Sequence, residues 1–224
     1  MPGVRRARHG AGLGAVSGGA GASAPELLVF DEFAAMTREE WDALSTLELP
    51  MDARVERLGT YPALFLDLDG TVRYNRRSPG SVINRAEETA VYEGVQEVLN
   101  AWRDDGFLIL GVTNQGGIAF GYTTVEEVEE GIELTRHLLG DVFHDVLYCP
   151  YHKEGRVPEF RRDSPDRKPG VGMIRRHERI QRIHGRVIDP ERSLMVGDRP
   201  EDRQLARNAG LQFAWAKDFF GREA

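Results

Sequence analysis

Segments rich in apolar residues alternate along this chain with segments in which apolar residues recur every three or four positions. The first kind covers five stretches of four to eight residues: 63–66, 107–113, 142–149, 193–197 and 211–215. Short runs of this length are typical of buried strands, whereas a spacing of three or four is typical of amphipathic helices. The alternation predicts an α/β fold with a doubly wound, Rossmann-like parallel sheet.

Helix signals lie between these predicted strands. Apolar residues recur at helical spacing over 95–102, and Gly106 follows as a natural helix stop. Thr124 with Glu127 forms a capping box, which predicts that the next helix begins there. Two further helices are expected, over 171–185 and 201–209. About twenty residues, 73–90, separate the first strand from the first of these helices and are expected to form a loop.

The first 60 residues have a different character. Residues 10–24 are mainly Gly, Ala and Ser, which predicts a flexible tail over 1–25. A secretory signal is the competing interpretation, because arginines precede the tail, although its centre is too glycine-rich for an apolar signal core. Residues 26–60 form an extension of unassigned role, with a short strand at 27–30 and a helix at 36–47. The main domain is expected over 61–224.

Composition narrows the class of protein. The 224 residues carry a net charge of −7, which argues against a general nucleic-acid binder, because phosphate-backbone affinity comes mainly from Lys and Arg. The only cysteine, Cys149, excludes an intrachain disulfide and fits a reducing, cytoplasmic location. No apolar run approaches the length of a membrane-spanning helix, so no membrane partner is expected.

Two aspartates end the first predicted strand. Asp67 and Asp69 stand two residues apart, and on an extended chain both face the same side. Ligands of open α/β sheets bind at this carboxyl edge. Alone, the pair is equally compatible with turn chemistry ahead of Gly70. An EF-hand calcium loop is disfavoured, because Gly70 stands at loop position 4 rather than 6.

Three further polar clusters follow the aspartates at predicted strand ends or in the loops beside them. They are Thr113, Asn114 and Gln115 after the second strand, Arg167 and Lys168 before a helix, and Asp198 with Asp202 after the fourth strand. Each cluster alone suits turns, caps or a solvated lysine. Together they supply a nucleophile, a cation site and donors for phosphoryl oxygens, which indicates phosphoryl transfer.

These motifs resemble the haloacid dehalogenase (HAD) phosphohydrolase superfamily. The stretches DLDGT (67–71), VTNQGG (112–117), RKPG (167–170) and GDRPED (197–202) are similar to its four motifs, and the resemblance covers about residues 61–215. Within the superfamily the chain is most similar to the histidinol-phosphate and heptose-bisphosphate phosphatases. The resemblance implies a HAD-like fold. The short inserts indicate little or no cap domain, so the site should be closed only by the loops 73–90 and 150–167.

The resemblance also implies a role for each motif residue. Asp67 would be the nucleophile, and Asp69 the general acid and base. Thr113 and Lys168 would complete the catalytic set. Asn114, Gln115 and Arg167 would bind substrate. Mg2+ would be held by Asp67, the backbone carbonyl of Asp69 and Asp198, with Asp202 outside the direct ligands.

The chain departs from the heptose phosphatases in their zinc loop. Cys149 is present, but Tyr151 stands where the pattern has His, with His152 one place on. Ser164 and Asp166 replace the two later cysteines. A structural zinc site needs four ligands, mostly Cys and His, so Zn2+ is not expected. Basic residues of this loop either face a distal anion of the substrate or are solvated; they are Lys153, Arg156, Arg161, Arg162 and Arg167.

Three functions remain open on this reading. The first is a phosphatase acting on a sugar phosphate or histidinol phosphate. The second is a polynucleotide 3′-phosphatase, which shares the TNQ-G-I and RKP-G-M patterns but fits an acidic chain less well. The third is a catalytically silent interaction protein that uses 26–60, which the intact Asp67, Asp69, Lys168 and Asp198 disfavour.

Overall fold

The computed structural model describes residues 59–222. All five predicted strand segments form one parallel sheet in the order β6-β5-β2-β8-β9. The strands are β2 (Ala63–Leu66), β5 (Leu108–Asn114), β6 (Asp145–Cys149), β8 (Leu194–Gly197) and β9 (Gln212–Trp215). The predicted α/β fold is therefore confirmed. The predictions for the tail, for 27–30 and for 36–47 lie outside the described residues.

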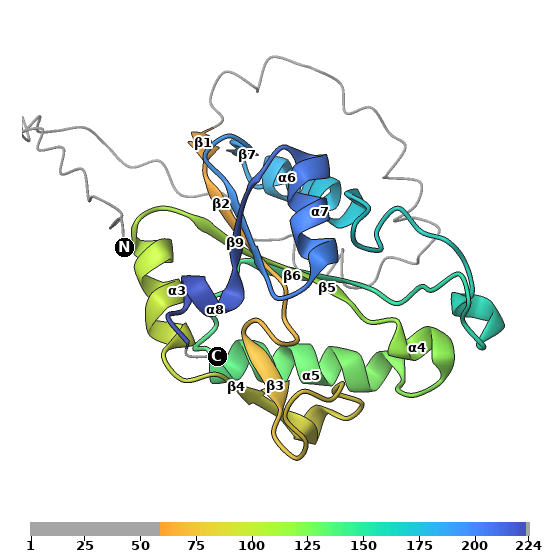
Figure 1. Cartoon of the computed structure of the whole chain (residues 1–224). Coiled ribbons are helices and arrows are strands. Elements are labelled where there is room, and N and C mark those ends of the chain that lie inside the picture. Colours follow the sequence, from red (N-terminus) through yellow and green to blue (C-terminus); the bar gives the residue numbers. More distant parts are fainter. Residues whose placement is uncertain (1–58, 223–224) are drawn as a thin grey trace, which may run out of the picture. The chain divides into compact units, whose positions relative to one another are not determined.

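Helices cover both faces of this sheet. Successive side chains of a strand point to opposite faces, and in β2 Leu64 and Leu66 join one apolar cluster while Ala63 and Phe65 join the other. Figure 1 shows α3 and α8 to one side of the sheet and α6 and α7 to the other. The helices are α3 (Val95–Asp104), α5 (Val125–Leu138), α6 (Gly172–Ile183), α7 (Pro200–Ala209) and α8 (Ala216–Phe219). Residues of α5 join the same cluster as those of α3.

The predicted helix ends match the structure closely. The Thr124 hydroxyl accepts a hydrogen bond from the Glu127 amide at 3.2 Å, as a capping residue does, and α5 begins at the next residue. Gly210 ends α7 with φ of 70°, a left-handed conformation that suits glycine. One strand prediction was too long: β6 begins at Asp145 rather than at 142, because Val142 and Phe143 pack into the core before the ladder starts.

The segment 73–90 is more ordered than a loop. It contains an antiparallel pair, β3 (Arg73–Asn75) and β4 (Thr89–Val91), and the short helix η2 (Ala86–Glu88), and β4 and η2 pack against α5. The prediction of an irregular loop was wrong because these strands are short and carry no alternating apolar pattern. The remaining elements are β1 (Gly59–Tyr61), which pairs with β7 (Arg186–Ile188), α4 (Gly117–Phe120) and η3 (Pro158–Phe160).

Only short segments are inserted between the strands and helices of the sheet domain in the described part of the chain. Within residues 59–222 the hairpin β3–β4, the segment around α4 and the loop that contains η3 lie beside the site. No helix in this range has the length and apolar character needed to cross a membrane.

Candidate active site

The carboxyl ends of neighbouring parallel strands bring the motif residues together. Asp67 follows β2, Thr113 lies at the end of β5 and Asp198 follows β8. All three line one pocket of about 380 Å3, and Lys168 enters it from the loop before α6. Both predicted enclosing segments contribute walls: residues 74–75 and 80–84 from one, and His152 with Arg167 from the other.

Lys168 lies between two buried carboxylates at the base of this pocket. Its ammonium group donates to Asp67 at 2.5 Å and to the Val112 carbonyl at 3.0 Å, and it lies 2.7 Å from Asp202. The exposed fractions of Asp67, Lys168 and Asp202 are only 5%, 5% and 0%. Charges this deeply buried are stable only when they are paired. The two ion pairs of Lys168 therefore fix the positions of the triplet Asp67, Lys168 and Asp202 relative to one another.

Burial and pairing act against each other on the pKa values of this triplet. Burial raises the pKa of Asp67 to about 7, helped by the charges of Asp202 and Asp69 and opposed by Lys168. Burial alone would lower the pKa of Lys168, but the two neighbouring carboxylates raise it above its ordinary value. Lys168 therefore remains an ammonium ion, and it is the group that favours the anionic nucleophile.

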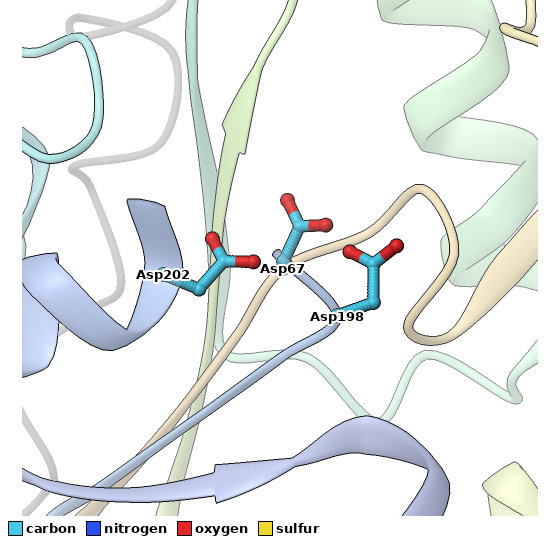
Figure 2. A group of neighbouring side chains, drawn as sticks. All are labelled: Asp67, Asp198 and Asp202. Carbon is cyan, nitrogen blue, oxygen red and sulfur yellow. The ribbon is translucent and has the colours of Figure 1, made fainter. Parts of the chain in front are cut away.

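Three carboxylates form a group that fits a divalent cation. One oxygen of each of Asp67, Asp198 and Asp202 lies within 4.8 Å of the others. Figure 2 shows the three side chains side by side, with Asp67 between the other two. An all-carboxylate set suits a hard cation such as Mg2+.

Two glycines permit this grouping. A Cβ at Gly70 would lie 2.2 Å from an Asp198 oxygen, and one at Gly197 would lie 2.4 Å from Asp202. Gly70 also has φ of 82°, which other residues adopt only under strain. The glycines of the DLDGT and GDRPED motifs thus allow the carboxylates of Asp198 and Asp202 to approach the neighbouring backbone.

The side chain of Asp69 does not belong to this group of three carboxylates and has partners of its own. One of its oxygens accepts from Arg73 Nε at 2.7 Å and the other accepts from Gln115 Nε2 at 2.7 Å. Burial raises the pKa of Asp69, but the charge and hydrogen bond of Arg73, with the bond from Gln115, bring it below its usual range. Asp69 also lines the pocket and is 28% exposed, so it remains accessible to a bound ligand.

The amide side chains of Asn114 and Gln115, at the end of β5, form hydrogen bonds with other residues of the protein. Asn114 accepts from the Lys168 amide at 2.9 Å and donates to the Lys168 carbonyl at 3.2 Å, which ties β5 to the RKPG loop. Gln115 Nε2 also donates to the Thr113 hydroxyl at 2.9 Å. Thr113, which is 1% exposed, keeps its own hydroxyl proton for another acceptor. Arg167 lines the pocket and donates to the Tyr151 carbonyl at 3.3 Å.

The residues at the zinc-loop positions do not form a zinc site. Cys149 is buried, and burial raises the pKa of its thiol to about 12. The His152 ring packs on Phe120 with centroids 4.9 Å apart. Asp166 forms an ion pair with Arg176 of α6. Within residues 59–222, the side chains that come close enough together to share a metal ion are Asp67, Asp198 and Asp202, and they do not include Cys149, His152 or Asp166.

Sequence reasoning missed two features of the site. Arg73 is 2% exposed and contacts Asp69, although a lone arginine in a predicted loop suggests a solvated side chain. Its spacing of four residues from Asp69 was the only signal available. The pocket mouth is lined by Phe120 and Tyr122, whose rings stack with centroids 5.7 Å apart.

Comparisons with known proteins agree with this geometry. The polynucleotide kinase 3 phosphatase family matches residues 63–220. The chain belongs to this family. It is 34% identical over 154 residues to the D-glycero-beta-D-manno-heptose-1,7-bisphosphate 7-phosphatase of Haemophilus ducreyi, which covers 67% of this chain and 79% of the relative. The enzyme of the same name from Escherichia coli K12 is 35% identical over 153 residues, covering 67% and 75%.

Solved structures of HAD-like phosphatases also resemble the chain. A HAD-like phosphatase from Mesorhizobium loti matches with a TM-score of 0.60 and 32% identity, covering 72% of this chain and 74% of that one. D,D-heptose 1,7-bisphosphate phosphatase from B. bronchiseptica, complexed with magnesium and phosphate, matches with a TM-score of 0.56 and 21% identity, covering 68% and 78%. The chain is a HAD-type phosphoric monoester hydrolase, as the four motifs predicted.

Proposed function

We propose that this HAD phosphatase is a magnesium-dependent hydrolase that works through an aspartyl-phosphate on Asp67. The observation that carries the proposal is the base of the pocket, where Asp67 contacts Lys168 and is grouped with Asp198 and Asp202. A nucleophile beside a fixed cation and a carboxylate cluster suits phosphoryl transfer. The magnesium and phosphate bound to the structural neighbour from B. bronchiseptica support the same chemistry.

Asp67 attacks phosphorus in the first half of the reaction. A bond forms between an Asp67 oxygen and phosphorus while the bond to the substrate's ester oxygen breaks. Lys168 offsets the negative charge of the nucleophile and of the phosphoryl group as a point charge. The free hydroxyl proton of Thr113 is available to a phosphoryl oxygen, since Gln115 already donates to that hydroxyl.

Asp69 moves the protons. In the first half the protonated form of Asp69 gives its proton to the departing alcohol oxygen. In the second half the resulting carboxylate takes a proton from the water that attacks the phosphorus on Asp67, which restores the acid form for the next turnover. Its position in the lining of the pocket and its hydrogen bonds to Arg73 and Gln115, rather than to Lys168, suit this separate role.

Asp67, Asp198 and the backbone carbonyl of Asp69 would hold Mg2+. Asp202 is the less suitable direct ligand, because one of its oxygens lies 2.7 Å from Lys168 and the other accepts from the Arg199 amide at 3.0 Å. When bound, the cation would neutralise phosphate charge and orient the phosphoryl group.

A small sugar phosphate is the substrate class that we favour, in the cytoplasm. The heptose-bisphosphate phosphatases at 34–35% identity support it. The pocket of about 380 Å3 is in the usual size range of small-molecule sites, roughly 300–1,000 Å3. Arg167 is the basic loop residue that lines the pocket and would face a distal anion.

A polynucleotide 3′-phosphatase is the second candidate, favoured by the family match over residues 63–220. The net charge of −7 counts against it, because a nucleic-acid strand is held mainly by basic side chains. The main domain over 61–224 would carry either activity, with 1–25 as a tail and 26–60 as an extension.

A substrate panel with and without magnesium tests both candidates. It contains heptose 1,7-bisphosphate, histidinol phosphate and a 3′-phosphorylated oligonucleotide, with phosphate release as the readout. We expect turnover of the small sugar phosphate that chelator abolishes and Mg2+ restores. Turnover of the oligonucleotide alone would reverse the ranking of the substrates, and turnover unaffected by chelator would reject the magnesium assignment.

A further inference from the structure

Arg73 is a buried arginine that contacts the site through Asp69. It lies at the start of β3, is 2% exposed and donates from Nε to Asp69 at 2.7 Å. A second nitrogen donates to the Gly131 carbonyl and to the Thr135 hydroxyl of α5, both at 3.0 Å. Burying a guanidinium is costly unless its donors are satisfied, so these contacts fix the side chain in one orientation.

The contacts connect α5 to the proton-transfer carboxylate. Thr135 in turn donates to the Gly131 carbonyl at 2.7 Å, so the two acceptors of Arg73 are themselves joined. The Arg73 amide also donates to the Leu68 carbonyl at 3.0 Å, and the Gly70 amide donates to the Arg73 carbonyl at 2.8 Å. The turn that carries Asp69 is therefore held by both the backbone and the side chain of Arg73.

Gln115 holds the other oxygen of the same carboxylate. Its Nε2 donates to Asp69 at 2.7 Å and to Thr113 at 2.9 Å, which uses both protons of the amide nitrogen. The two donors of Asp69, Arg73 and Gln115, come from different elements. Each carboxylate oxygen has two acceptor positions, so one position on each remains for a ligand in the pocket.

We propose that Arg73 is a positioning residue that, together with Gln115, fixes the Asp69 carboxylate for proton transfer to the leaving group. The inference rests on the proposed role of Asp69. A general acid acts only when it is held within hydrogen-bond reach of the atom it protonates. Within residues 59–222 no additional domain covers the site, and the α5–Arg73–Asp69 contacts supply this orientation from the catalytic domain itself.

The leaving group provides a readout that a purely structural role would not move. A primary alkyl phosphate such as glucose 6-phosphate needs a proton on its departing oxygen, whereas the p-nitrophenolate ion leaves readily without one. The ratio kcat/KM reports the steps up to transfer to Asp67. We expect Arg73→Met to lower kcat/KM about a hundredfold for the alkyl ester, and by about threefold or less for p-nitrophenyl phosphate.

Two further variants keep the test decisive if Arg73→Met does not fold. Thr135→Val removes one hydrogen-bond acceptor of Arg73 and leaves the residues that contact Asp69 unchanged. It should lower kcat/KM in the same pattern as Arg73→Met but by a smaller factor, roughly tenfold for the alkyl ester. Arg73→Lys should retain more alkyl-phosphatase activity than Arg73→Met. Arg77→Met is the matched control, because Arg77 pairs with the exposed Glu87 at 3.3 Å and has no contact with Asp69.

A double-mutant cycle separates this inference from the proposed function. In an Asp69→Asn background, Arg73→Met should cause no further loss with the alkyl ester. Equal losses for both esters, or no loss for either, would overturn the role of Arg73. Heptose 1,7-bisphosphate, whose 7-phosphate is also a primary alkyl ester, replaces glucose 6-phosphate if the wild-type protein does not hydrolyse the latter. Absence of phosphatase activity in the wild-type protein toward all of these esters would instead reject the proposed function.

Discussion

The base and the mouth of the pocket differ in how deeply their side chains are buried and in the segments that provide them. At the base, Asp67, Lys168 and Asp202 are at most 5% exposed and satisfy one another electrostatically. At the mouth, Val82 and Tyr122 are 61% and 57% exposed and come from connecting segments rather than from the sheet. The difference indicates that the sheet fixes the chemistry, whereas the surface segments are free to set which phosphate ester is accepted.

The largest effect should follow replacement of the nucleophile. Asp67→Asn keeps the size of the side chain but removes the attacking oxyanion, and we expect kcat to fall by at least about 10^4-fold. Phosphate release in the presence of Mg2+ measures it, and a thermal melt checks that the variant is folded. Retained activity in a folded variant would show that Asp67 is not the nucleophile, and the base of the pocket would then no longer account for the chemistry.

Removal of the buried ammonium group of Lys168 should lower both the catalytic rate and the stability of the fold. Lys168→Met leaves Asp67 and Asp202 facing each other without a counter-charge, and we expect about 10²–10³-fold lower kcat and a loss of about 3–5 kcal/mol in the free energy of unfolding. Urea denaturation and steady-state kinetics measure the two effects.

The double variant Lys168→Met with Asp202→Asn is the matched comparison. It removes one of the stranded carboxylates, so stability should partly recover while activity should not. Recovery of both properties would mean that Lys168 serves only to neutralise Asp202.

Changes at the mouth should affect substrate choice instead. Tyr122→Ala should raise KM for the true substrate by up to about tenfold with little change in kcat, and should alter the free energy of unfolding by no more than about 0.5 kcal/mol. Tyr61→Ala, at an exposed tyrosine outside the pocket, is the control. A fall in kcat that equals the effect at Lys168 would contradict the division between the two regions.

The smallest effect on catalysis is expected at an ion pair that lies outside both regions, where a change should affect stability alone. Asp145 lies 3.3 Å from His177; burial raises its pKa, but the hydrogen bond and charge of His177 bring it below the usual range. A depressed carboxyl pKa stabilises the folded state above the unfolded value, near pH 4, and this contribution is lost as pH falls through the folded value.

The expected outcome for Asp145→Asn follows from that sign. The variant should be about 1–2 kcal/mol less stable near neutral pH, and the free energies of unfolding of the two proteins should converge as the pH falls below about 4. Urea titrations at several pH values measure the difference. A constant gap down to the lowest pH would show that the Asp145 carboxylate contributes nothing through its charge.

The same contrast explains which features could be predicted from the sequence. The strands of the parallel sheet are contiguous apolar runs, and the motif residues follow directly at their ends, as Asp67 follows β2. The pair β3–β4 was missed because its three-residue strands include Arg73 and Asn75, which are buried without being apolar. Burial of this kind depends on contacts with α5, which lies about 60 residues further along the chain.

Roles within the site show a similar limit. The sequence indicated that Asn114 and Gln115 belong to the site, and both line the pocket. It could not indicate that Asn114 binds the backbone of Lys168 or that Gln115 bridges Asp69 and Thr113, because amide partners are chosen in three dimensions. The substrate-binding roles of Asn114, Gln115 and Arg167 stay predictions.

Trapping the covalent intermediate tests the central claim most directly. In Asp69→Asn the second half of the reaction is slowed, while p-nitrophenolate can still leave without a proton. Rapid mixing with p-nitrophenyl phosphate and Mg2+, an acid quench and peptide mass spectrometry should give a burst of about one nitrophenolate per site and a phosphorylated peptide modified at Asp67. A burst without a modified peptide, or phosphate on another residue, would contradict the account.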